Sequence, residues 1–102
     1  MKNLINEAPK VAEAFFNLTA AIRESSVLGT KTNELVLIGV FTASRSLKGI
    51  KTHVDRALQA GATQDEIVSA IYLALPVCGI GSVNAALDEA MLAIKNHMPE
   101  KV

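Results

Sequence analysis

Apolar residues recur along the chain at spacings of three and four, which is the period of an α-helix, and no segment alternates in steps of two as a strand does. Five helices are predicted from this pattern. They run from Pro9 to Glu24, from Asn33 to about Ser44, onward to Ala60, from Thr63 to the residue before Pro76, and from about Gly81 to Asn96. The pattern therefore predicts an all-α fold of about five helices.

Residues that favour helix ends stand at several of these boundaries. Pro9 suits a first helical position, because the N–H that proline lacks would have no partner there. Thr32 is a plausible cap for the second helix, and Gly61 supplies a left-handed stop for the third. Thr63 and Glu66 have the spacing of a capping box, which predicts the start of the fourth helix.

The apolar faces of three helices predict how they pack. The first helix carries a stripe that we expect to face the core: Val11, Phe15, Leu18 and Ile22. The last helix carries Val83, Leu87, Met91 and Ile94 on one face. The second helix is apolar around its whole circumference, which is typical of a helix buried on all sides. Its β-branched residues would also suit a strand, but its helical neighbours favour a helix.

One uncharged stretch, Ile67 to Leu87, is long enough to span a bilayer. Pro76 and Gly79 interrupt it, and no basic flank of the kind that orients spanning helices follows. Two buried helices joined by a tight bend therefore fit it better, and we expect no membrane partner.

Composition narrows the classes of function. The 102 residues suit one domain over 1–102, and ten basic residues balance ten acidic ones, which is not the charge of a nucleic-acid-binding protein. Only 20% of the residues are charged, against roughly 25% in typical soluble domains. A surface short of charge favours association, so we expect a homo-oligomer.

The amino terminus and the cysteine content bear on location and redox chemistry. Met1 to Lys10 lacks the apolar core of a secretory signal, so a cytoplasmic location is expected. Cys78 is the single cysteine, which excludes an intrachain disulfide and a Cys-rich zinc site. We expect Cys78 to be a small buried apolar residue.

Candidate chemistry lies near the junction of the second and third helices. On a helical projection, Ile50, Val54 and Leu58 form an apolar stripe, and Ser46 and His53 lie together at its edge. Histidine titrates near physiological pH, which suits proton transfer. A histidine at the edge of a core is also commonly a structural group, and spacing alone leaves both interpretations open.

A basic cluster surrounds this histidine. Four basic residues fall within twelve positions, with only Asp55 among them to balance the charge: Arg45, Lys48, Lys51 and Arg56. Such a cluster attracts anions, although a solvated helix face has the same composition. Glu34 lies in the first turn of its helix, where a carboxylate interacts favourably with the helix dipole, so it could be there without any catalytic role.

These residues carry a resemblance to the carboxymuconolactone decarboxylase family, which includes the alkylhydroperoxidase D-like proteins. In the hydroperoxidase branch a glutamate is followed after eleven residues by Cys-x-x-Cys-x-x-x-His, and Glu34 and His53 stand at the glutamate and histidine positions. The segment that follows also fits, through Leu58, Gly61, Thr63, Glu66 and Ile67. The resemblance implies assembly as a trimer or hexamer.

The departures from that pattern bear on function. Ser46 and Gly49 stand at the two cysteine positions, and Lys48 replaces a residue that is often histidine in that branch. Peroxide reduction there needs an attacking thiolate and a resolving thiol, which neither serine nor glycine supplies. The peroxiredoxin activity that family membership suggests is therefore disfavoured, and Cys78 lies outside the motif.

This sequence also resembles the decarboxylase branch of the family, which has a similar scaffold without the cysteine pair. It implies a non-redox lyase or ligand-binding member that acts on a small carboxylate, with no metal or organic cofactor. Glu34, Ser46 and His53 are then the candidate catalytic residues. Lys48, Arg45 and Arg56 are the candidate ligand-binding residues. A hydroperoxidase-type oxidoreductase and a non-catalytic oligomeric binding protein remain the alternatives.

The expected geometry of this site is specific. A glutamate buried ionised and unpaired would be costly, so Glu34 should find a partner, and His53 is the candidate. Glu34, Ser46 and His53 should converge on one pocket, with Lys48 or Arg45 at its mouth.

Overall fold

The structure is a computed structural model that describes residues 1–97. Within them the chain forms seven helices and no strand. The helices are α1 (Lys2–Glu7), α2 (Pro9–Ser25), α3 (Thr30–Ala43), α4 (Leu47–Gln59), α5 (Gln64–Tyr72), α6 (Leu75–Cys78) and α7 (Ile80–His97). The all-α class is confirmed. The five longer helices correspond to the five predicted ones, and the short α1 and α6 are additions.

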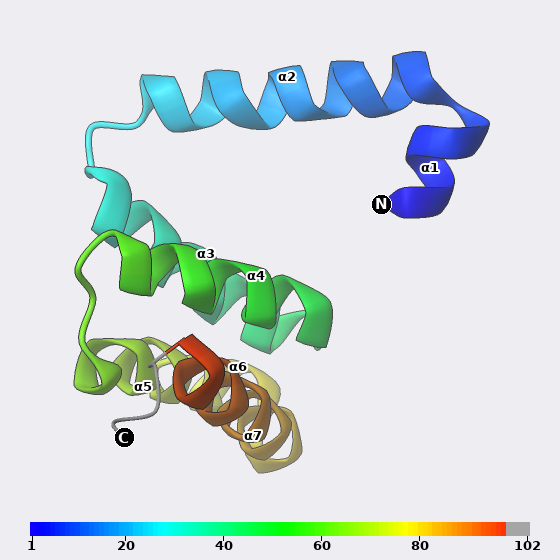
Figure 1. Cartoon of the computed structure of the whole chain (residues 1–102). Helices are drawn as coiled ribbons and strands as arrows, with labels where there is room; N and C mark the ends of the chain where they lie inside the picture. Colours follow the sequence, from blue (N-terminus) through cyan, green and yellow to red (C-terminus); the bar gives the residue numbers. More distant parts are fainter. Residues whose placement is uncertain (98–102) are drawn as a thin grey trace, which may run out of the picture.

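The helices form a packed body and a separate arm (Figure 1). In the body, α3 packs against α4, α4 against α7, and α5 against both α3 and α7. The arm is α2, which runs alone above the body with α1 folded back at its far end. A short link, residues 26–29, joins the arm to the start of α3.

The core lies where α3, α4, α5 and α7 meet. Its largest fully buried side chains include Ile38, Ile50, Val54, Ile67 and Ile71. The small residues Ala86, Ala90 and Ala93 line the buried face of α7, so its backbone can approach the branched side chains closely. Ile50 and Val54 are fully buried and Leu58 packs against the core, as the predicted α4 stripe requires.

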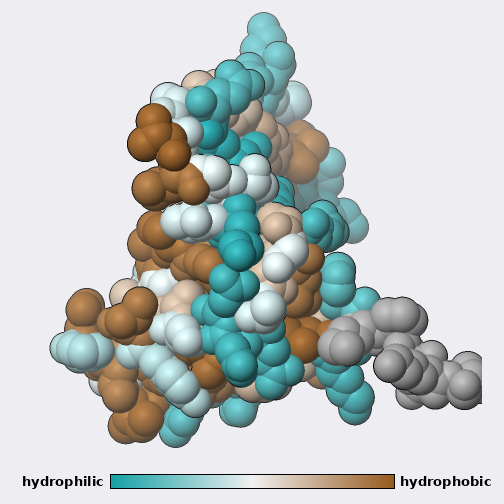
Figure 2. Space-filling model, turned by 90° about the vertical axis from the view of Figure 1, so that its left-hand side faces the viewer, coloured by the Kyte–Doolittle hydropathy of each residue, from teal (hydrophilic) through white to brown (hydrophobic). Residues whose placement is uncertain are grey.

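The prediction that the α2 stripe faces the core is wrong. Val11, Phe15, Leu18 and Ile22 are 45–58% exposed, and the buried residue of α2 is Ala12. The physical reason is that α2 lies away from the body and finds its main contacts in α1. In Figure 2 apolar side chains follow one edge of the face in view, so this chain leaves much apolar surface uncovered.

The prediction that the second helix is buried on all sides is also wrong. In α3, Val36 is 50% and Val40 is 56% exposed, whereas Glu34, Ile38 and Thr42 are buried. The helix therefore has one buried and one open face, although its sequence is apolar on both.

The face predicted on the last helix is largely present. Val83 and Ile94 are buried and Leu87 packs against the core, whereas Met91 is exposed. The uncharged stretch folds into α5, α6 and the start of α7. Within residues 1–97, no helix combines the length and the apolar character needed to cross a membrane.

Cys78 ends α6 and is only partly buried, rather than fully buried as expected. It packs against the core, and its thiol donates to the Ala74 carbonyl oxygen at 3.2 Å.

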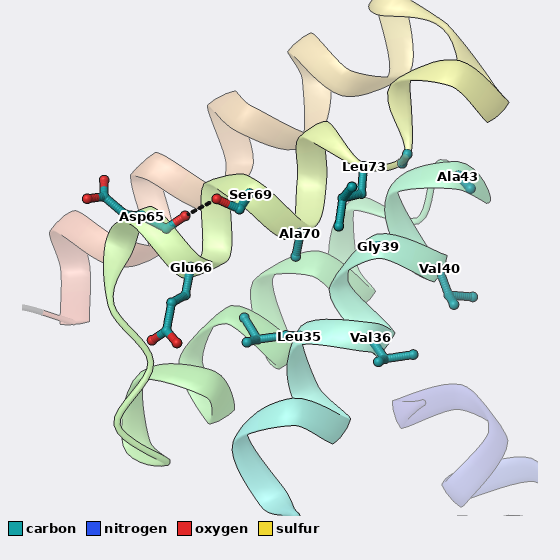
Figure 3. Close-up of a pocket in the computed structure, with 11 residues that line it drawn as sticks. Leu35, Val36, Gly39, Val40, Ala43, Asp65, Glu66, Ser69, Ala70 and Leu73 are labelled. Atoms are coloured by element: carbon teal, nitrogen blue, oxygen red, sulfur yellow. Dashed lines mark hydrogen bonds between the residues drawn. The ribbon is translucent and has the colours of Figure 1, made fainter. Parts of the chain in front are cut away.

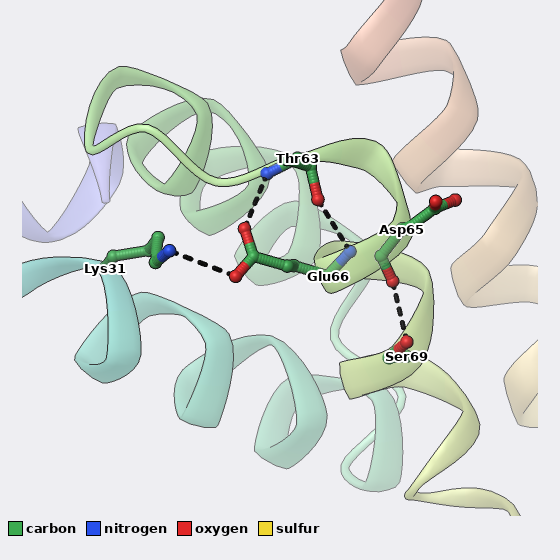
Figure 4. Close-up of polar contacts among 5 residues, drawn as sticks. All are labelled: Lys31, Thr63, Asp65, Glu66 and Ser69. Carbon is green, nitrogen blue, oxygen red and sulfur yellow. Dashed lines mark hydrogen bonds and ion pairs between the residues drawn. The ribbon is translucent and has the colours of Figure 1, made fainter.

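The predicted capping box opens α5 (Figure 4). The Glu66 N–H donates to Thr63 Oγ1 at 3.1 Å, and the Thr63 N–H donates to Glu66 Oε1 at 2.9 Å. Lys31 Nζ on α3 donates to Glu66 Oε2 at 3.0 Å. The Thr63 backbone N–H and the Lys31 ammonium hold the pKa of Glu66 below its usual value. This cluster ties the start of α5 to the start of α3.

Candidate functional site

A buried carboxyl–imidazole pair joins α3 to α4. Glu34 is 2% exposed, and among residues 1–97 it is the only ionisable residue that is buried. His53 Nδ1 lies 2.5 Å from Glu34 Oε2. Because an ionised carboxylate without a partner would be costly to bury, this hydrogen bond accounts for Glu34 in an otherwise apolar helix. The predicted contact between Glu34 and His53 is present.

The pair fixes which imidazole nitrogen faces the carboxyl group. With Glu34 ionised, Nδ1–H of His53 donates to Oε2. Nε2 is then the acceptor of a neutral imidazole or the second donor of an imidazolium. The pair can thus hold a proton on the ring or release it, which is what acid–base chemistry requires.

Phe41 fixes the plane of the same imidazole. The two rings stack with their centroids 5.0 Å apart and their planes 19° from parallel. The Phe41 ring also covers Gly49, where a Cβ atom would lie 2.5 Å from Cδ1. That space is therefore taken, and with Phe41 in this position residue 49 has room only for glycine.

Glu34 also borders a polar cleft of about 370 Å³, which we call the Glu34 cleft. It is lined by Arg23, Thr30, Glu34, Arg56, Gln59 and Ala60. Within residues 1–97 the ion pairs are Lys31–Glu66 and Glu34–His53, so neither guanidinium is paired with a described carboxylate. Two arginines beside a buried carboxyl–imidazole pair suit an anionic ligand.

Three elements bring these side chains together. Arg56 lies on α4 one turn after His53, and Arg23 lies in the last turn of α2. The link after α2 is held by Ser26, whose hydroxyl donates to Asn33 Oδ1 at 2.5 Å and accepts the Leu28 N–H at 3.2 Å. These bonds fix the end of α2 beside the first turn of α3, where the cleft opens.

The other predicted site residues lie elsewhere. Ser46 is the N-cap of α4, and its hydroxyl accepts the Gly49 N–H at 3.3 Å. Ser46 precedes His53 by seven residues, about 10 Å along a helix axis, and the Phe41 ring lies over α4 between them. Of the three residues expected to converge on one pocket, only Glu34 lines the Glu34 cleft. His53 contacts Glu34 but is not among the lining residues, and Ser46 is remote from the pair, so the expected convergence is corrected.

The three basic residues predicted to bind the ligand also lie in different places. Arg56 lines the Glu34 cleft, but Lys48 is exposed and is not among its lining residues. Arg45 lines a different cavity, between the α3–α4 turn and α7. The expectation that Lys48 or Arg45 stands at the mouth of the pocket is not met, because the cleft opens toward the other end of α4.

Sequence reasoning missed Arg23. It lies eleven residues before Glu34, outside the basic cluster of α4, and no local motif marks it. The short link of residues 26–29 between α2 and α3 was the available signal, because it must keep the end of α2 close to the start of α3.

A larger groove of about 670 Å³ runs between α3 and α5, and we call it the α3–α5 groove (Figure 3). From α3 it is lined by Leu35, Val36, Gly39, Val40 and Ala43, and from α5 and the turn after it by Asp65, Glu66, Ser69, Ala70, Leu73 and Ala74. Its ionisable residues, Asp65 and Glu66, lie at one end, and Glu66 is already paired with Lys31. The groove suits an apolar surface better than a reaction.

In the part of the chain that the structure describes, no three His, Cys, Asp or Glu side chains come together as a metal site.

Comparison with known proteins identifies a family and a protein of similar fold. A sequence model of the carboxymuconolactone decarboxylase family matches residues 9–91. The crystal structure of an apo carboxymuconolactone decarboxylase family protein from Legionella pneumophila has a TM-score of 0.80, with 23% identity over 94% of this chain and 85% of that chain. At this identity the likeness concerns the fold. No curated protein matches the chain.

Proposed function

The chain belongs to the carboxymuconolactone decarboxylase family, and from this premise we propose that it binds a small carboxylate in the Glu34 cleft and exchanges a proton with it. The reaction class is that of a lyase that needs no cofactor. The observation that carries the proposal is that Glu34, hydrogen-bonded to His53, shares one cleft with Arg23 and Arg56, and neither arginine forms an ion pair within residues 1–97.

The cleft has the charge and size for such a ligand. Guanidinium groups present parallel N–H donors that match the two oxygens of a carboxylate, and they stay charged at all physiological pH values. A volume of about 370 Å³ is near the lower end of the range for small-molecule sites. Arg23 and Arg56 would therefore hold one carboxylate of a compact dicarboxylate.

The pair would supply the proton that decarboxylation needs. When a carboxylate leaves as carbon dioxide, the C–C bond breaks and its electron pair remains on the carbon, which must then take up a proton. Glu34 lines the cleft and His53 contacts Glu34 from outside it, so the protonated pair would deliver the proton through the Glu34 carboxyl group, and water would restore it afterwards. A second carboxylate held by the arginines would keep the ligand in place during this step.

No observation favours the hydroperoxidase alternative. The Ser46 hydroxyl caps α4, the Phe41 ring fills the space beside Gly49, and the Cys78 thiol donates a hydrogen bond to the carbonyl oxygen of Ala74, the N-cap of α6. Peroxide consumption driven by a thiol reductant, and lost in Cys78→Ser, would restore that alternative.

Ligand binding is tested with succinate, phthalate and carboxymuconolactone, the compound in the family name, by calorimetry and by thermal stabilisation. We expect at least one of them to bind the wild type, and Arg23→Gln and Arg56→Gln to weaken it about tenfold or more. Lys51→Gln removes a positive charge from an exposed position on α4 and should leave affinity within about twofold. Equal affinity in all four folded proteins would contradict the proposed site.

A further inference from the structure

A third cavity lies between the α3–α4 turn and the first turn of α7. It has a volume of about 280 Å³ and is lined in part by Arg45, Ser82, Leu47, Ile50 and Ala85. We call it the Arg45–Ser82 cavity. It shares no lining residue with the Glu34 cleft.

Ser82 is the residue that indicates a bound ligand. It is 6% exposed, and its Oγ atom has no hydrogen-bond partner among the described residues. The other two buried polar residues are satisfied, because Glu34 pairs with His53 and the Thr42 hydroxyl donates to the Ile38 carbonyl oxygen at 2.8 Å. A buried hydroxyl without a partner costs free energy, so a group that accepts its proton is expected in the cavity.

Arg45 gives the cavity its charge. It is the one ionisable residue among those that line it. Its backbone has φ of 60°, the left-handed conformation that residues other than glycine rarely adopt, and this turn between α3 and α4 brings Arg45 to the cavity. The ligand should therefore carry one negative charge.

The other lining residues indicate the size and polarity of the rest of the ligand. Leu47, Ile50 and Ala85 are apolar, and the volume is just below the usual range for small-molecule sites. Gly81 and Ser82 lie in the first turn of α7, whose N–H groups have no partner within the helix. Both residues line the cavity, so these N–H groups are candidate hydrogen-bond donors for an anion there.

We propose that the Arg45–Ser82 cavity binds a short-chain monocarboxylate. The Arg45 guanidinium and the Ser82 hydroxyl donate to its two oxygens, and its aliphatic chain lies against Leu47 and Ile50. This site is independent of the Glu34 cleft and of the function proposed there.

The experiment uses propionate as the probe, with dissociation constants from amide chemical-shift titration of the full chain. Four variants are compared with the wild type. Ser82→Ala removes the hydroxyl; Arg45→Asn removes the charge but keeps a residue that tolerates positive φ. Arg56→Gln alters the Glu34 cleft instead, and Lys51→Gln is the exposed charge-loss control.

We expect propionate to shift the amides of Gly81 and Ser82. Ser82→Ala and Arg45→Asn should each weaken the affinity read from these two amides about tenfold or more, and Arg56→Gln and Lys51→Gln should leave the affinity at these amides within about twofold. Propionamide, which lacks the charge, should not bind. Ser82→Ala should fold normally, because it removes an unsatisfied buried group.

Several results would overturn the assignment. Affinity unchanged by both Ser82→Ala and Arg45→Asn would mean that the cavity holds only water. Equal binding of propionamide would remove the role of charge, and tighter binding of inorganic phosphate than of propionate would replace the monocarboxylate by another class of anion.

Discussion

Position 49 has no side chain because the ring of Phe41 fills the space beside it, and the same ring stacks on His53. A side chain at position 49 would displace the ring and with it the packing that orients the imidazole. The absence of a side chain at position 49 and the support of His53 are thus one structural feature.

Gly49→Ala therefore has a predictable cost. Overpacking costs about 1–3 kcal/mol, which exceeds the gain of about 1 kcal/mol from replacing a helical glycine by alanine. We expect a net loss in the free energy of unfolding, measured in urea, and partial recovery when Phe41→Leu is added. Gly81→Ala, where an added Cβ would meet nothing within 4 Å, should be neutral or stabilising. A Gly49→Ala protein as stable as the wild type would contradict this packing argument.

At this scale the sequence predicted the contact between Glu34 and His53, because a carboxylate in an apolar helix needs a partner. It did not predict Arg23, and it assigned Ser46, Lys48 and Arg45 to the wrong place. Residues of one helix share a face by periodicity, but which end of that face meets a cleft depends on tertiary packing.

At the scale of elements, the five longer helices could be predicted from their apolar period, and Pro9, Gly61 and the Thr63 capping box mark the ends of α2, α4 and α5. The expected cap Thr32 is wrong, because α3 begins at Thr30 after Gly29 and Thr32 lies within its first turn. Burial was predicted less well. The stripe of α2 and the open face of α3 are apolar, but an apolar pattern shows only that a face avoids water and not which surface covers it. The short α1 and α6 were not predicted, since neither is long enough to show a helical period.

The contact of Glu66 with Thr63 and Lys31 should make the stability of the fold depend on pH. The pKa of Glu66 in the folded protein is lowered from 4.5 by the Thr63 backbone N–H and by Lys31, so the ionised form stabilises the fold. Glu66→Gln should therefore lower the denaturant midpoint at pH 7. The stabilisation is complete above the unfolded-state pKa and is lost as the pH falls through the lower folded-state pKa, so the two proteins should begin to converge below about pH 4.5 and coincide below the folded-state pKa. A difference between the two proteins that is independent of pH would show that charge plays no part.

At the scale of the whole molecule, two apolar surfaces face solvent within one chain. The α2 stripe (Val11, Phe15, Leu18 and Ile22) belongs to a helix that stands apart from the body, and the α3–α5 groove is apolar along most of its length. A 17-residue amphipathic helix is a suitable occupant for such a groove. We therefore expect α2 of one copy to dock in the α3–α5 groove of another, and a trimer or hexamer remains the prediction for the assembly.

Light scattering at micromolar concentration should then give a mass of several chains of 10.8 kDa. Leu18→Asp on α2 and Val40→Asp in the groove should each shift the mass toward that of one chain, because each buries a charge in the interface. Val77→Asp, at an exposed apolar position on α6, is the matched control and should not. A wild-type mass of one chain would rule out this assembly.

The central claim is that the Glu34–His53 pair exchanges a proton with a carboxylate held in the Glu34 cleft. Carboxymuconolactone is incubated with the protein in D₂O, and deuterium on the ligand carbon is followed by NMR. We predict incorporation by the wild type and a loss of about a hundredfold or more in Glu34→Gln and His53→Gln, with ligand affinity within about twofold in both. Incorporation no faster than in buffer while the ligand saturates the wild type, or undiminished in both folded variants, would contradict the account.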